Sequence, residues 1–197
     1  MKKHVLILIM AFSMIALGAD AQSKLKFGIM GGLNVSEMRF DQTITDKDNQ
    51  AGFFVGPMVD LNLPILGLNV DAALLYDQQK VGALDEEDDL KFIELPVNLK
   101  YNIGIGSLLS VYVATGPQFS FNVGDDNILK HEYKLKSSQF SWNIGCGVKI
   151  AKHLVVGYRY NIGLGDYADR RDLNTGNIID TVKKKDGTHH IHAAIIF

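Results

Sequence analysis

The sequence FIELPVNLKY at residues 92–101 alternates strictly between two kinds of side chain. Aliphatic or aromatic residues occupy every odd position from Ile93 to Tyr101, whereas the even positions include Glu94, Asn98 and Lys100. Successive side chains of a β-strand point to opposite faces of a sheet, so this period of two predicts a strand with one apolar and one more polar face.

The same period extends outward from this segment in both directions. It recurs in residues 24–35, 51–63, 68–76, 108–122, 139–150, 154–164 and 189–197. Each of the eight segments is long enough for a tilted strand that crosses a bilayer, which needs about 9–11 residues.

The connections between these segments are of two kinds that alternate along the chain. Short turns are expected at Pro64–Gly67, Ile103–Ser107 and Ala151–His153, and long polar loops at Ser36–Gln50, Asp77–Asp89, Gly124–Ser138 and Gly165–Thr188. Short turns at one end and longer loops at the other are typical of an outer-membrane barrel. The predicted fold is therefore all-β: an eight-stranded antiparallel up-and-down transmembrane β-barrel.

The composition of the two faces predicts which one meets lipid. A soluble barrel would instead enclose its apolar face. Here the apolar face is bulky, and aromatic residues near strand ends fit the girdles of a membrane barrel; these are Phe53, Tyr76, Tyr101, Phe121, Phe140 and Trp142. We therefore expect Val97, Leu99, Val111, Val113 and Ile144 to contact lipid.

The polar face predicts a charge network inside the barrel. Its members are Asp60, Asp71, Glu94, Lys100, Lys149 and Arg159. Buried ions must pair because desolvating an isolated charge costs several kcal/mol. We expect Asp71 to pair with Lys100, and Glu94 to reach Arg159 across the narrow lumen. A structural network is favoured, while a proton or ion path and a catalytic site remain alternatives.

The two ends of the chain carry export and assembly features. Lys2 and Lys3 precede an apolar run, and Ala19-Asp20-Ala21 resembles a cleavage site, so residues 1–21 are predicted to be a removed signal peptide. An uncleaved anchor helix is the alternative. Residues 22–197 then form the barrel domain, and the terminal Phe197 resembles the assembly signal of bacterial outer-membrane barrels.

Three histidines near the C-terminus raise the question of a metal site. His190 and His192 share a strand face and could chelate, but no acid or cysteine is fixed beside them in the sequence. We therefore expect ordinary strand residues, no metal site and no cofactor. His131 and His189 likewise show no spacing to serines and acids that would define a catalytic triad.

Charge runs and net charge say little about partners. The acidic run Asp85–Asp89 and the basic run Lys183–Lys185 are expected to be solvated loop segments, or to contact divalent cations and surface anions respectively. The formal net charge of −2, without a basic stripe, argues against a nucleic-acid partner. The single cysteine, Cys146, excludes an intramolecular disulfide.

Four short segments, in this order and spacing, resemble the PorT-like or "porin family" outer-membrane β-barrel proteins of Bacteroidetes-type Gram-negative bacteria. They are Phe27–Asn34, Ile93–Val97, Thr115–Pro117 and Tyr158–Leu164. The resemblance covers residues 22–197 and implies an eight-stranded barrel in the outer membrane. It does not imply one activity.

These observations favour a structural or surface-interaction protein over an enzyme. Its long external loops would meet surface partners whose identity the sequence does not give. The expected surroundings are outer-membrane lipid, lipopolysaccharide and the outer-membrane assembly machinery. A small channel or transporter for polar solutes and a lipid-modifying outer-membrane enzyme are the alternatives.

Overall fold

The computed structural model describes most of the chain from Leu25 to Phe197. The described residues are 25–36, 50–65, 67–83, 86–106, 108–124, 127–128, 133–135, 137–164, 166–171, 178–183 and 187–197. The predicted signal peptide, residues 1–21, and most of the first long loop lie outside them. Within the described residues, no helix is long and apolar enough to cross a membrane.

The described residues form β-strands joined by turns. In chain order the strands are β1 (Leu25–Ser36), β2 (Gln50–Asn62), β3 (Leu68–Ala73), β4 (Leu75–Ala83), β5 (Glu86–Ile105), β6 (Leu109–Asn122), β7 (Asn127–Ile128), β8 (Tyr133–Leu135), β9 (Ser138–Ile150), β10 (Leu154–Gly163), β11 (Asp166–Arg171), β12 (Ile178–Lys183) and β13 (Thr188–Ile196).

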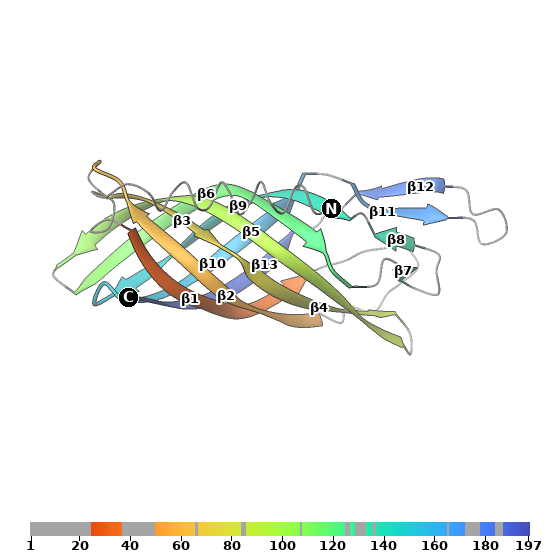
Figure 1. The fold of residues 1–197 in the computed structure, drawn as a ribbon, viewed down its shortest axis with the longest axis horizontal. Coiled ribbons are helices and arrows are strands. Elements are labelled where there is room, and N and C mark those ends of the chain that lie inside the picture. Colours follow the sequence, from red (N-terminus) through yellow and green to blue (C-terminus); the bar gives the residue numbers. More distant parts are fainter. Residues whose placement is uncertain are drawn as a thin grey trace.

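The main sheet closes on itself as an antiparallel barrel. Each strand pairs with its neighbour along the chain, and β13 pairs with β1, so that Gly31 lies opposite both Ala193 and Val55. Because β3 and β4 together occupy one strand position, the barrel has the eight strand positions that the sequence predicts. Figure 1 shows these strands tilted steeply around the barrel.

The predicted strand at residues 68–76 is interrupted at Leu74, which separates β3 from β4. The Leu74 N–H donates to the Pro57 carbonyl oxygen at 3.0 Å, but proline has no N–H with which to return the bond. Gly56 keeps the two backbones close, because a Cβ there would lie 2.0 Å from the Leu74 oxygen. One missing ladder bond therefore explains the interruption.

Three of the predicted loops contain strands. The expected loop Asp77–Asp89 is wrong, because β4 continues to Ala83 and pairs with β5 from Glu86, which also places most of the acidic run in a strand. The connections at 124–138 and 165–188 contain β7, β8, β11 and β12, which form a separate four-stranded sheet. Polar composition suggested loops, but paired strands beyond the bilayer need no apolar face.

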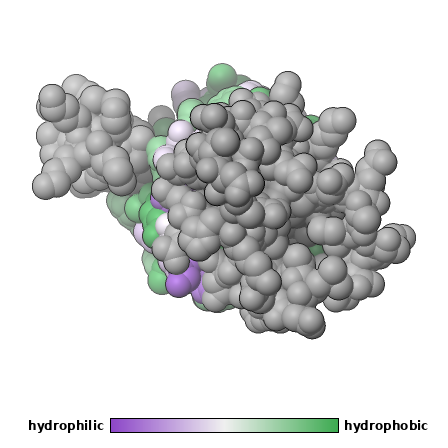
Figure 2. Space-filling view, turned by 90° about the vertical axis from the view of Figure 1, so that its right-hand side faces the viewer, coloured by the Kyte–Doolittle hydropathy of each residue, from purple (hydrophilic) through white to green (hydrophobic). Residues whose placement is uncertain are grey.

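The two faces of the barrel strands are oriented as the sequence predicts. The Val113 and Ile144 side chains on the outside are 58% and 53% exposed, whereas Lys100 and Arg159 on the inside are each 4% exposed. Seen from the end where β11 and β12 lie, the described surface visible at the margin is largely hydrophobic, with some hydrophilic patches (Figure 2). The prediction of an apolar exterior is confirmed.

The interior is less polar than the sequence analysis expects. A cluster of buried apolar residues fills part of it: Met30, Phe54, Met58, Ala73, Leu75, Tyr112, Val155, Ala194 and Ile196. These residues occupy the inward positions of their strands, between the charged and amide groups. An eight-stranded barrel is narrow enough for side chains to fill, and here apolar and polar side chains share that task.

The outward direction of Val113 can be tested with a charge. An arginine at Val113, close to the middle of β6, should reduce the free energy of unfolding by about 2–4 kcal/mol, because arginine would enter the hydrocarbon. The matched control is Val123→Arg, just beyond the end of β6, with an expected cost of about 0–1 kcal/mol. Urea unfolding in lipid bilayers measures both. Equal tolerance of the two substitutions would contradict the assignment.

Candidate functional site in the barrel interior

Two carboxylates face each other on neighbouring strands near the short-turn end. Asp60 of β2 and Asp71 of β3 are partners in the strand register and are both 2% exposed. Like charges placed directly opposite on one face of a sheet are destabilising. The fold must therefore bring cations to this pair.

Two lysines supply the compensating charge, and together the four residues form what we term the lower charge layer. Lys100 forms an ion pair with Asp71, and the Lys149 Nζ lies 3.7 Å from the Asp60 Oδ2. Lys100 also lies over the ring of Tyr112, with its Nζ 4.7 Å from the ring centroid. The structure thus brings together four of the six residues of the predicted network.

Amide groups complete the hydrogen bonding of this layer and connect it to the next. Asn69 donates to Asp60 at 2.9 Å, and Asn98 donates to Asp71 at 2.8 Å. Asn143 in turn donates to the Asn98 Oδ1 at 3.3 Å, and Asn161 donates to the Asn143 Oδ1 at 2.8 Å. The sequence analysis placed these asparagines on the polar face without assigning them a role.

The remaining two members of the predicted network lie apart from the lower charge layer. Glu94 has an oxygen within 4.8 Å of ligand atoms of both Asp77 and His190. The Arg159 guanidinium lies 5.8 Å from the centroid of the Phe54 ring, and its Nε and Nη2 have no hydrogen-bond partner among the described residues. The expected contact between Glu94 and Arg159 is not among the ion pairs formed by described residues.

Asp77, Glu94 and His190, which we term the upper cluster, were not grouped by the sequence analysis. Asp77 was assigned to a loop, and His190 was described as having no acid beside it. Closure of the barrel brings β13 to the interior face shared by β4 and β5, although these strands are far apart in the sequence. Only the three-dimensional fold could have revealed this neighbourhood.

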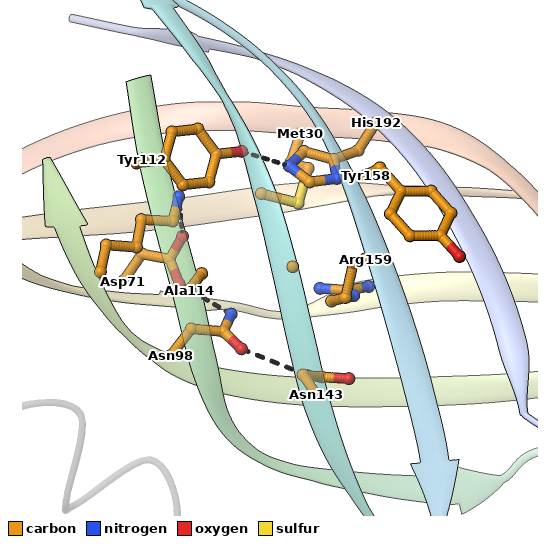
Figure 3. Close-up of a pocket in the computed structure, with 11 residues that line it drawn as sticks. Met30, Asp71, Asn98, Tyr112, Ala114, Asn143, Tyr158, Arg159 and His192 are labelled. Carbon is orange, nitrogen blue, oxygen red and sulfur yellow. Dashed lines mark hydrogen bonds and ion pairs between the residues drawn. The ribbon is translucent and has the colours of Figure 1, made fainter. Parts of the chain in front are cut away.

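A small cavity lies between the two groups (Figure 3). Arg159, His192, Tyr112 and Asn143 are among the residues that line it, and the His192 Nε2 lies 3.1 Å from the Tyr112 hydroxyl. Its volume of about 10 Å³ matches the space needed for about one water molecule. A cavity of this size separates the interior groups without forming a route for solutes.

The described histidines do not form a catalytic triad. His189 lies on the outer face, where its Nδ1 is 2.6 Å from the Tyr158 hydroxyl and its ring packs against Tyr160 at 4.9 Å. His131 lies outside the described residues. The described part of the chain therefore offers no serine activated by a histidine at this position.

A closed antiparallel barrel with an apolar exterior and buried charges has the architecture of a transmembrane β-barrel, because closure leaves no unpaired backbone edge in lipid. The family comparison agrees, since the model of the outer membrane protein beta-barrel domain matches residues 5–183. The chain belongs to this family and is an outer-membrane protein.

Solved structures support the fold. The chain is similar to Neisserial surface protein A, with 15% identity, a TM-score of 0.57, and coverage of 87% of this chain and 95% of that one. It also aligns with Ail, the attachment invasion locus protein of Yersinia pestis, with 17% identity, a TM-score of 0.47, and coverage of 88% and 99%. No curated protein sequence matches the chain. At these identities the likeness concerns the fold alone.

The ion pair between Asp71 and Lys100 can be tested with a double-mutant cycle. Asp71→Asn should destabilise the barrel by about 3–5 kcal/mol, because it leaves Lys100 buried beside a neutral amide. The double variant Asp71→Asn/Lys100→Met should recover much of this loss, because both charges are removed together. Fluorescence of Trp142, the single tryptophan, reports unfolding in urea.

The control for this cycle is Lys152→Met, which changes an exposed lysine in the turn after β9 and should alter stability by less than about 0.5 kcal/mol. A double variant no more stable than Asp71→Asn alone would show that the pair is not a compensating unit.

Proposed function

We propose that this outer-membrane barrel acts at its surface, as a structural or interaction protein, through the connections at its long-loop end. The observation that carries the proposal is the four-stranded sheet of β7, β8, β11 and β12. It lies beyond one end of the barrel in Figure 1. A chain that needed only to anchor in lipid would not require ordered structure beyond the barrel.

Two separate connections contribute to this sheet. The β7–β8 hairpin belongs to the connection between β6 and β9, and β11 and β12 belong to the connection between β10 and β13. Pairing of Ala168 with Leu135 joins the two connections. The shared sheet reduces the freedom of both connections, which supports a preformed surface that could bind a partner with less ordering cost.

A channel or transporter is less well supported. The described interior is occupied by the lower charge layer, the amides and the apolar cluster, and the cavity between them holds about one water molecule. A lipid-modifying enzyme is also less well supported, because the described histidines have no triad geometry.

We further propose that the chain is a PorT-like member of its family, and that Phe197 acts as its assembly signal. The four resembling segments support the first proposal. The position of Phe197 supports the second: its N–H donates to the Phe27 oxygen at 2.8 Å, and its ring is 69% exposed on the outer face. Lipopolysaccharide and the assembly machinery are the partners that this proposal implies.

The proposal predicts which end of the barrel faces the medium. In a Cys146→Ser background, Asp180→Cys in β12 should react with a polymer-linked maleimide on intact cells, because it belongs to the sheet at the long-loop end. Lys152→Cys, in the short turn after β9, should react only after the outer membrane is permeabilised. The amount of labelled protein on a gel measures both.

The reverse pattern would place the four-stranded sheet in the periplasm and would overturn the proposed surface role. Labelling of both cysteines on intact cells would show that the protein does not keep one orientation.

A further inference from the structure

We propose that Asp77, Glu94 and His190 bind one divalent first-row transition-metal ion, such as Zn²⁺, inside the barrel. The three side chains come from β4, β5 and β13, and each offers a ligand atom within 4.8 Å of the other two. All three are buried, with 0%, 3% and 1% exposure respectively. The proposal is independent of the surface role argued above.

The register explains why two carboxylates meet here. Asp77 lies opposite Phe92, and Glu94 lies opposite Leu75, so the two acids are diagonal neighbours on the interior face of one strand pair. Two carboxylates this close in a desolvated interior repel each other unless a cation lies between them. A divalent ion would balance their charge fully.

The described cations are distributed unevenly between the two acidic groups. Lys100 and Lys149 are committed to the lower charge layer. Arg159 is the described buried base nearest in register to the upper cluster, directly opposite His190 on β10. Its Nε and Nη2 form no hydrogen bond with described residues, so these atoms do not neutralise the two carboxylates by direct contact.

The ligand set favours a particular class of ion. Imidazole suits zinc, iron, nickel and copper, whereas magnesium and calcium prefer oxygen ligands alone. One imidazole with two carboxylates is therefore a set for a first-row ion, with expected metal–ligand distances of about 2.0–2.2 Å. Small side-chain rotations about a common centre would bring the three ligand atoms to these distances.

Neighbouring groups already hold the acids in place. Asn34 donates to the Asp77 Oδ2 at 2.5 Å, and Gln79 donates to the Asp77 Oδ1 at 2.8 Å. The Ser120 hydroxyl donates to the Glu94 Oε1 at 3.4 Å. Such outer hydrogen bonds orient metal ligands and tune their affinity. Asn34 and Ser120 come from β1 and β6, so strands on both sides of β4 and β5 support the site.

The edge of Phe54 fixes the third ligand. Its ring centroid lies 5.3 Å from that of His190 in a T-shaped arrangement, which restricts rotation of the imidazole. A bound ion would link β13 to β4 and β5 through the lumen, in addition to the backbone ladders at the barrel wall. Its binding free energy would therefore add to the stability of the closed barrel.

The test uses the full-length, tag-free protein refolded in micelles with Zn²⁺ and then dialysed. Mass spectrometry of the elements should find about one zinc per barrel, and Zn²⁺ should raise the urea midpoint of unfolding. Replacement by Co²⁺ should give the visible absorption of a site with nitrogen and oxygen ligands. His190→Gln and Glu94→Gln should each weaken zinc binding at least about tenfold.

His192→Gln is the matched control, because His192 lies on the same strand and the same interior face but outside the cluster. It should retain one zinc. Absence of bound zinc in the wild-type protein would overturn the proposal and would show that the three groups form a hydrogen-bonded triad only. Retention of zinc by both Glu94→Gln and His190→Gln would also overturn it. The wild-type Co²⁺ spectrum decides the matter if a variant fails to fold.

Discussion

Closure of the sheet is the constraint on which the rest of the structure depends. A bilayer offers no water to the backbone, so every N–H and C=O within it must find a partner in the protein. The ladder between β1 and β13 provides the last set of partners and removes both sheet edges. With eight strand positions, closure also fixes a narrow lumen that side chains can fill.

The narrow lumen then determines the chemistry of the interior. Charges that point inward are desolvated, so they remain ionised only with partners close by. Asp60 and Asp71 are adjacent acids that persist because Lys149 and Lys100 reach them. Between the acids and the upper cluster, amides and an apolar cluster complete the packing, so the fold works as a solid body with surfaces at its two ends.

Much of this architecture could be predicted because period two is a local property. Alternation in residues 92–101 placed Lys100 inside and Leu99 outside, and the adjacency of two strands along the chain was enough to expect the pair with Asp71. The break at Leu74 was not predicted, because it depends on the missing N–H of Pro57 on a neighbouring strand. Strands beyond the bilayer escaped prediction because both of their faces meet water, so no alternation marks them.

The upper cluster shows the limit of sequence reasoning most clearly. Asp77 lies in a polar segment that resembled a loop, and His190 is more than a hundred residues away from it. Their proximity follows from the return of β13 to the start of the barrel, which no local pattern records. Phe197 remains a predicted assembly signal, and residues 1–21 remain a predicted signal peptide.

The central claim is that the interior is packed, so the protein acts at its surfaces and not through its lumen. Electrical recording of the purified barrel in planar bilayers tests this claim most directly. The account predicts no steady ion conductance from the wild-type protein under an applied voltage. A stable open channel in the wild-type protein, reproduced after refolding and absent from empty bilayers, would contradict the account and support transport instead.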